Sequence, residues 1–166
     1  YTLRNLRNSL FGAPLLGSPP LELLAEARLI ARVSATYSLT ADLAMGLLGG
    51  KLKRMELLSA RLGDVLSHLY MASSCVWRYQ VEGDPAMLPI ARAAIRVQLD
   101  LAATTLRDLY ANMPSRALRI AAPVLLRGTH HLAPLRDRDL LAISDGLREN
   151  RIHLDRLCPD VGTPSS

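Results

Sequence analysis

The sequence predicts an all-α fold: an antiparallel up-and-down helical bundle with three long helices, a broken fourth and a polar terminal helix. Three observations predict it. Apolar residues make up 49% of the 166 residues and aromatic residues only 4%, a balance that suits a core of leucine and alanine better than a β-sheet. Apolar positions recur in alternating steps of three and four, as on one face of a helix. Glycine and proline, which end helices, stand between these stretches.

The length of the chain fits one domain with a core of its own. We expect an N-terminal segment over residues 1–18, the core of the bundle over 19–135, and a polar terminal helix with a flexible tail over 136–166. No uninterrupted run of 18 apolar residues is present, so we expect no membrane-spanning helix. The sequence begins with Tyr1 rather than methionine, and we therefore expect it to be a piece of a longer polypeptide.

The first long helix is predicted to start at Ser18, as the capping residue before Pro19 and Pro20, and to end at Leu48. Two apolar stripes run along it, which predicts a central place in the bundle. Gly49 and Gly50 follow as the point where the chain reverses, because glycine takes the left-handed conformation at helix ends without penalty.

The second helix is predicted over about residues 52–81. Its large apolar side chains form one stripe, consisting of Leu58, Leu62, Val65, Leu69 and Val76. Small residues form a neighbouring stripe, consisting of Ala60, Gly63, Ser67 and Ser74. Glycine inside a helix costs about 1 kcal/mol relative to alanine. We therefore expect Gly63 to be a site of close packing against a neighbouring helix.

A Glu-Gly-Asp-Pro turn over 82–85 leads to the third helix, predicted over about 88–112 and ended by Pro114. A short fourth helical segment over 115–127 is interrupted by Pro123. After a loop, the polar helix is predicted over about 137–157.

Charged residues on the second helix raise the question of a catalytic site. Arg61, Asp64 and His68 are spaced three and four apart and lie on one side of the helix. They fit either a catalytic or binding stripe or an ion network bordering the core, and we favour the network because no nucleophile or second acid accompanies them. Asp42 interrupts the apolar first helix, and a buried carboxylate needs a partner. Across the hairpin, Arg54 or Arg61 is the expected one.

Other patterns of chemistry are not expected here. His130 and His131 are adjacent, so their side chains diverge, and no further ligand follows at metal-binding spacing. Neither cysteine has the acid and base neighbours of a nucleophile. No glycine-rich phosphate loop occurs. We therefore assign no catalytic, cofactor-binding or metal-binding residue to this chain.

The net charge of +5 permits an anionic partner. The arginines of this chain are scattered singly, however, so we do not expect nucleic-acid binding. The segment 115–127 mixes apolar residues with Arg116, Arg119 and Arg127. Such a short basic amphipathic stretch fits either a subunit contact or a membrane surface, and we favour the subunit contact.

The stretch from Ala41 to Ser74 resembles the C-terminal extension of the long bacterial acyl-CoA dehydrogenases of fatty-acid β-oxidation. The shared pattern is Asp-x-Ala-Met, then Leu-Gly-Gly-x-Leu-Lys-Arg, then Ser-Ala-Arg-Leu-Gly-Asp-x-Leu-Ser-x-Leu-Tyr. The EGD turn, the NMPSR break and the HHLAP loop are similar in order and spacing, so the resemblance spans about residues 20–135. It is more distantly similar to the C-terminal helical domain of the mitochondrial very-long-chain enzymes.

The resemblance implies an FAD-dependent parent enzyme that oxidises acyl-CoA to trans-2-enoyl-CoA. It places the flavin domain and the catalytic base upstream, so that this chain alone would bind no FAD and be inactive. It implies an accessory domain that packs on the catalytic body and aids homo-oligomer or peripheral membrane contacts, in the cytoplasm or at the inner membrane. The alternative is a free-standing helical interaction module without enzymatic context.

Overall fold

A computed structural model describes residues 18–129 and 137–149, and it confirms the all-α bundle for these residues. Its α-helices are α2 (Leu24–Leu48), α3 (Glu56–Glu82), α4 (Leu88–Ala111), α5 (Arg116–Leu125) and α6 (Asp137–Glu149). Short 3-10 segments accompany them: η1 (Leu21–Leu23), η2 (Gly49–Arg54), η3 (Pro85–Met87) and η4 (Leu126–Thr129). The expected N-terminal segment up to residue 17, the His130–His131 pair and the tail with Cys158 lie outside the described residues.

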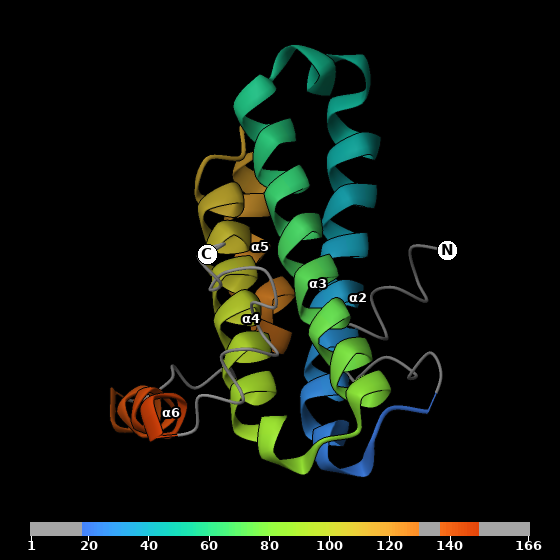
Figure 1. Ribbon diagram of the computed structural model, residues 1–166. Coiled ribbons are helices and arrows are strands. Elements are labelled where there is room, and N and C mark those ends of the chain that lie inside the picture. Colours follow the sequence, from blue (N-terminus) through green and yellow to red (C-terminus); the bar gives the residue numbers. More distant parts are fainter. Residues whose placement is uncertain (1–17, 130–136, 150–166) are drawn as a thin grey trace, which may run out of the picture.

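The long helices α2, α3 and α4 run side by side with alternating direction, as expected for an up-and-down bundle (Figure 1). The short α5 runs back beside α4, and α6 contacts α4 near its start (Figure 1). α4 contacts α2, α3, α5 and α6, so α4 holds the central place that the sequence predicted for the first helix. Buried residues of α4 extend from Ala93 to Tyr110, almost to its end, whereas the last turn of α2 is exposed at Met45 and Leu47.

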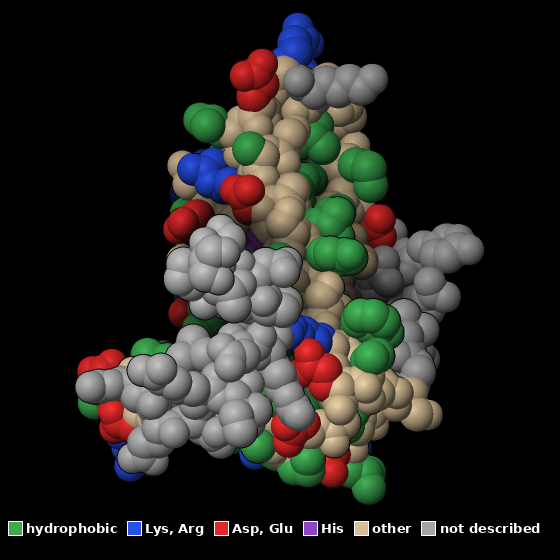
Figure 2. Space-filling view, in the orientation of Figure 1, with side chains coloured by type: hydrophobic (Ala, Val, Ile, Leu, Met, Phe, Trp, Pro, Cys, Tyr) green, Lys and Arg blue, Asp and Glu red, His purple; other side chains and the backbone are tan. Residues whose placement is uncertain are grey.

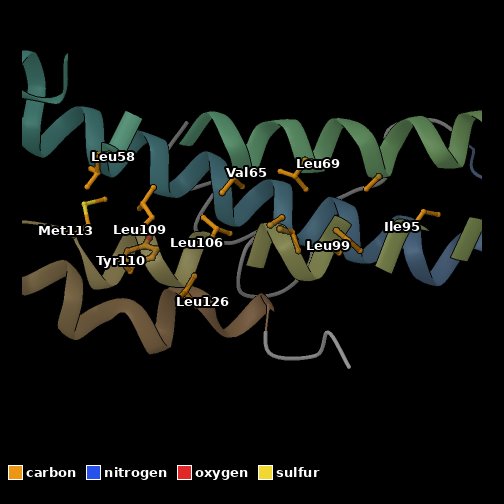
Figure 3. Close-up of a cluster of buried hydrophobic side chains, with 14 of the residues drawn as sticks. Leu58, Val65, Leu69, Ile95, Leu99, Leu106, Leu109, Tyr110, Met113 and Leu126 are labelled. Carbon is orange, nitrogen blue, oxygen red and sulfur yellow. The ribbon is translucent and has the colours of Figure 1, made fainter. Parts of the chain in front are cut away.

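A large part of the core consists of aliphatic side chains that α3 and α4 direct toward each other (Figure 3), and α2 and α5 add further buried side chains. Val65 and Leu69 of α3 meet Leu99 and Leu106 of α4, and all of them are buried. Leu58, Val65 and Leu69 belong to the large apolar stripe predicted for the second helix. Burial of a side chain of this kind contributes about 1.5–3 kcal/mol, so this row of contacts holds the two helices together.

The chain reverses between α2 and α3 at Gly49, whose φ of +48° lies in the region that favours glycine. The prediction of a helix end at this glycine is confirmed. The second helix, however, begins at Glu56 and not near Leu52, because Lys51 to Arg54 belong to the separate 3-10 segment η2. The cations Lys51, Lys53 and Arg54 are therefore not in the first turn of α3. That turn holds Glu56, an acid that suits the positive end of the helix dipole.

The turn between α3 and α4 has the predicted composition. Gly83 has a φ of +62°, and the Asp84 carboxylate accepts a hydrogen bond of 3.0 Å from the Ala86 backbone N–H. Pro85 follows at the start of η3, where its missing N–H is of no consequence. α4 then covers residues 88–111, close to the predicted 88–112.

Two details of the short elements differ from the sequence prediction. Ser18 does not cap the first helix: η1 starts after Pro20 without a side-chain cap, and α2 begins only at Leu24. Pro123 does not divide α5, which continues for two residues beyond it and then tightens into η4. Proline lacks only one N–H, so near the end of a short helix it costs a single hydrogen bond and the chain need not break.

Candidate functional site

The predicted trio on α3 does not form a compact charged site. The His68 Nδ1 atom lies 2.8 Å from the Oε1 atom of Gln98 on α4, a hydrogen bond between an imidazole and a neutral amide. Arg61 is half-buried and Asp64 is exposed. His68 thus connects α3 to α4 through a neutral partner. The ion network expected of the trio stays a prediction.

Asp42 lies half-buried near the end of α2, and Arg54 is exposed at the end of η2 across the reversal. The hairpin that would bring Asp42 toward Arg54 or Arg61 is therefore present. The pairing itself stays a prediction.

Gly63 does not fill the role that the sequence predicted. It is exposed, and a Cβ atom added to it would meet no described heavy atom within 4 Å. Ala60 and Ser67 of the predicted small-residue stripe are exposed as well. The expectation was wrong because small residues suit an open surface as well as a close helix contact, and the sequence of one helix does not show which neighbour faces it. No helix of the described bundle packs on this side of α3.

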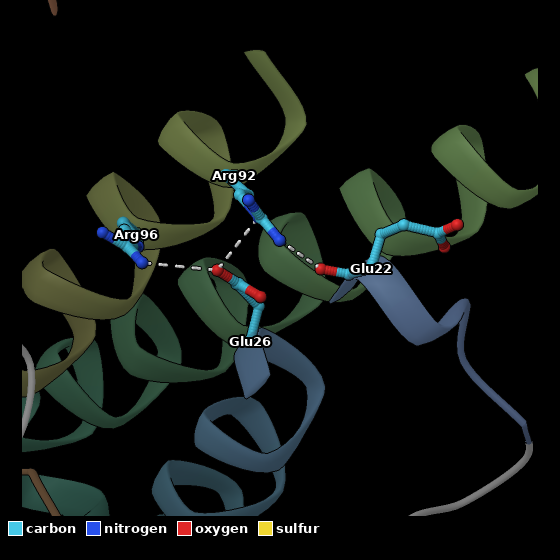
Figure 4. Close-up of polar contacts among 4 residues, drawn as sticks. All are labelled: Glu22, Glu26, Arg92 and Arg96. Carbon is cyan, nitrogen blue, oxygen red and sulfur yellow. Dashed lines mark hydrogen bonds and ion pairs between the residues drawn. The ribbon is translucent and has the colours of Figure 1, made fainter. Parts of the chain in front are cut away.

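The most buried charged group is Glu26, in the first turn of α2 (Figure 4). Only 2% of Glu26 is exposed, and its Oε1 atom lies 3.6 Å from Nε of Arg92 and 3.4 Å from Nη2 of Arg96. Arg92 also donates a hydrogen bond of 2.6 Å to the backbone carbonyl of Glu22. We name these residues the Glu26 cluster.

The Glu26 cluster joins the start of α2 to the start of α4. One carboxylate oxygen of Glu26 lies next to the guanidinium groups of Arg92 and Arg96, which come from successive turns of α4. Both arginine side chains remain almost half exposed, so their charge is hydrated while the carboxylate is not. Sequence analysis missed Glu26 because an acid in a first turn also suits the helix dipole. One signal was available: Glu26 lies three residues after Leu23 and seven before Val33, within a buried stripe.

α5 presents the basic surface that the sequence predicted. Arg116, Ile120, Val124 and Arg127 are all exposed and are spaced so that they share one face of the helical segment. Arg119 differs, because its Nη1 atom donates a hydrogen bond of 2.8 Å to the Met113 carbonyl and thereby holds the start of α5. The exposed face thus combines two apolar side chains with two cations.

A second exposed apolar surface lies on α3. A set of exposed residues, spaced three or four apart, shares one side of this helix. We name them the α3 stripe: Ser59, Gly63, Leu66, Tyr70, Ser73, Trp77 and Val81. Tyr70 is 73% exposed and Trp77 is 67% exposed. None of these residues is charged. Figure 2 shows several hydrophobic side chains on the surface along the course of α3.

Residues for catalysis or metal binding do not converge within the described ranges. No group of three His, Cys, Asp or Glu residues there could hold a metal ion. Cys75 is half-buried, and burial raises the pKa of its thiol while nearby Arg78 lowers it by a smaller amount. A raised pKa keeps the sulfur in its less reactive thiol form.

The described residues also do not fit a flavin site. The interior of the bundle is filled by aliphatic, methionine and tyrosine side chains that pack together. The Oε2 atom of Glu26 is a buried oxygen without a described hydrogen-bond partner, but a carboxylate repels the phosphates of a dinucleotide. In the described part of the chain, moreover, no helix combines the length and the apolar character needed to cross a bilayer.

These features define a helical bundle domain with two exposed apolar surfaces and an internal ion cluster. The chain belongs to the acyl-CoA dehydrogenase, C-terminal, bacterial type family, whose family model matches residues 2–166. The match confirms the resemblance seen on the central motif and extends it to both ends of the chain. As a C-terminal domain of this kind, it implies a catalytic domain upstream in the same protein. No solved structure matches the chain.

Proposed function

We propose that this chain is the accessory C-terminal domain of an FAD-dependent acyl-CoA dehydrogenase and packs on the catalytic part of that enzyme. The observation that carries the proposal is the family match over residues 2–166, which favours this function over a free-standing interaction module. The parent enzyme would oxidise acyl-CoA to trans-2-enoyl-CoA in bacterial fatty-acid β-oxidation, in the cytoplasm or at the inner membrane. The flavin and the catalytic base would belong to the upstream part.

Within this proposal the domain acts by binding and not by chemistry. The Glu26 cluster and the α3–α4 core give it a stable frame of its own. Its exposed apolar surfaces on α3 and α5 supply contact area for the parent enzyme, for a second enzyme molecule or for a membrane surface.

The test compares the whole parent polypeptide with a version that ends before this domain. We expect the shortened enzyme to keep its flavin site but to unfold at a lower temperature and to lose activity faster on heating, because the surface that this domain covers becomes exposed. The chain of 1–166 alone is expected to bind no flavin and to oxidise no acyl-CoA. Activity of the isolated chain, or a shortened enzyme as stable as the whole one, would contradict the proposal.

A further inference from the structure

The α3 stripe has the composition of a protein interface. Between Val65 and Trp77 the sequence contains no Asp, Glu, Lys or Arg, although α3 is exposed along one side through this whole stretch. Exposed helix faces normally carry charges, whereas the centres of interfaces are depleted of charge and enriched in Tyr, Trp and Met. Tyr70 and Trp77 stand in the middle and second half of this stripe. The stripe therefore has the character of a surface that is covered in the assembled protein.

The absence of charge also indicates the kind of partner. A membrane surface is recognised by arginine and lysine next to apolar side chains, as on the face of α5 with Arg116 and Arg127. The α3 stripe has no such cations. A protein surface that is itself uncharged and apolar is the better match.

The order of residues along the stripe makes it complementary to itself. Its first part has small residues at Ser59 and Gly63, and its second part has large ones at Tyr70, Trp77 and Val81. If two α3 helices pack in antiparallel orientation with a two-fold axis near residues 68–70, Trp77 of each copy lies opposite Ser59 and Gly63 of the other. A parallel pairing would instead place Trp77 against Trp77 and leave a gap between the two glycines.

From this arrangement we propose that the α3 stripe is the contact with a second copy of this chain, in a two-fold antiparallel pair of α3 helices. The inference specifies the oligomer contact that belongs to the proposed function. It explains why an exposed helix position is occupied by glycine, since Gly63 would provide the space for the indole ring of the second copy. The two-fold symmetry makes each contact occur twice, and an uncharged stripe has no like charges to repel each other in a chain of net charge +5.

The size of the stripe sets the expected affinity. From Ser59 to Val81 it extends about 33 Å at 1.5 Å per residue. A single pair of helices over that length belongs with the small class of interfaces, so we expect a Kd on the order of 10 µM for the chain alone. In the whole enzyme, other contacts between two polypeptides would add to it.

The test is the mass of the chain in solution, measured by analytical ultracentrifugation from about 1 to 300 µM, a range set around the expected affinity. We expect a change from 18.2 kDa to twice that mass. Trp77 is the only tryptophan, so its fluorescence reports on the stripe itself, and we expect its emission to shift to shorter wavelength as the dimer forms.

Two variants and a control make the test specific. Gly63→Leu should weaken dimerisation by at least about tenfold, because it fills the space for the indole ring. It should not unfold the monomer, since the added side chain meets no described atom and leucine is a better helix former than glycine. Tyr70→Gln should weaken the dimer similarly. Met71→Gln, a change at another exposed position on a different side of α3, should leave it unaffected.

Three outcomes would overturn the inference. They are a chain that stays monomeric at all concentrations, a Gly63→Leu variant that dimerises like the original, and an emission of Trp77 that shifts only on binding to the catalytic part or to vesicles of anionic lipid. Neither of the first two outcomes would contradict the proposed function, which is tested by the comparison of the whole and the shortened parent enzyme.

Discussion

Thr40 on α2 and Tyr110 on α4 are joined by a hydrogen bond of 3.0 Å between their hydroxyl groups, and both side chains are almost completely buried. The Thr40 hydroxyl also lies 2.7 Å from the Thr36 carbonyl, to which it donates its single hydrogen. Tyr110 is therefore the donor to Thr40. The bond links two helices that are also joined at their starts by the Glu26 cluster, so α2 is attached to α4 by polar contacts at two levels.

Replacing Tyr110 with phenylalanine tests the contribution of this bond. The ring and its packing remain, while Thr40 loses the hydrogen that it accepts. We expect Tyr110→Phe to lower the free energy of unfolding by about 1 kcal/mol, as measured by urea denaturation. The control is Tyr70→Phe, an exposed position where the change should stay within about 0.5 kcal/mol. Equal stability of the two variants would show that the bond contributes nothing measurable.

Alkaline pH should destabilise the protein through two groups. Burial raises the pKa of the Tyr110 hydroxyl, and burial also raises the pKa of the Cys75 thiol. In the unfolded chain these groups lose their protons near their ordinary pKa values of about 10 and about 8.5. The stability that the neutral forms contribute is thus complete below those values and is lost as the pH rises through them.

We therefore expect the free energy of unfolding to fall between about pH 8.5 and pH 11, in urea denaturation at a series of pH values. The fall should be shallower in Tyr110→Phe and in Cys75→Ala, because each variant removes one of the two groups. Tyr70→Phe should leave the slope unchanged. If Tyr110→Phe has the same slope as the original chain, ionisation of this tyrosine is not coupled to unfolding.

The sequence predicted the architecture because its strongest signals are local. The apolar stripe of α3 repeats every three to seven residues and the Gly83–Asp84–Pro85 turn spans three, and the structure has both where they were expected. The polar contacts were not predictable in the same way. Glu26 and Arg96 are 70 residues apart, as are Thr40 and Tyr110, and only the packing of α2 on α4 brings them together.

Gly63 is a second residue whose surroundings the sequence of its own helix does not show. A glycine inside a helix suggests a special role, but a glycine fits a close contact and an open surface equally well. Whether a neighbour exists depends on the arrangement of the other helices. In the described bundle Leu58, Val65 and Leu69 of α3 are buried in the core, and the side with Gly63 is left exposed. The periodicity of one helix shows which of its faces are apolar. It does not show which of these faces other helices cover.

Replacing the two arginines of the Glu26 cluster should destabilise the protein more than replacing its glutamate. Replacing both Arg92 and Arg96 with alanine leaves a carboxylate buried without a cation, which should cost about 3–5 kcal/mol in the free energy of unfolding. Glu26→Met removes the buried charge and keeps the volume, while the arginines stay hydrated. Its cost should be within about 1.5 kcal/mol of zero. The control Arg107→Ala changes an exposed arginine of the same helix.

Urea denaturation of these variants at neutral pH distinguishes the possibilities. A double arginine variant as stable as Arg107→Ala would mean that the carboxylate finds another partner or is hydrated, and that the cluster does not hold α2 to α4. A strongly destabilised Glu26→Met would mean that the carboxylate contributes more than packing and charge balance.

The pairing of Asp42 across the hairpin is tested by Asp42→Asn. If the carboxylate pairs with Arg54 or Arg61, the variant should lose on the order of 1 kcal/mol, seen as a lower thermal midpoint, because the amide keeps the shape and removes the charge. Asp64→Asn, at an exposed position of α3, is the matched control. An unchanged midpoint for Asp42→Asn would count against the pairing.

Binding of α5 to a membrane surface is tested by flotation with liposomes that contain anionic lipid. If this face meets lipid, reversing two charges of the segment 115–127 in Arg116→Glu/Arg119→Glu should strongly reduce the floated fraction, because cations near the surface contribute about 1 kcal/mol each. Arg119 also holds the Met113 carbonyl, so this variant can lose structure at the start of α5. Arg116→Glu/Arg127→Glu avoids that effect and should reduce flotation equally. Arg28→Glu/Arg107→Glu, at exposed positions of α2 and α4, changes the net charge by the same amount and is the control. If it reduces flotation as much as the variants of the segment 115–127 do, the effect is one of total charge and that segment has no special part in it.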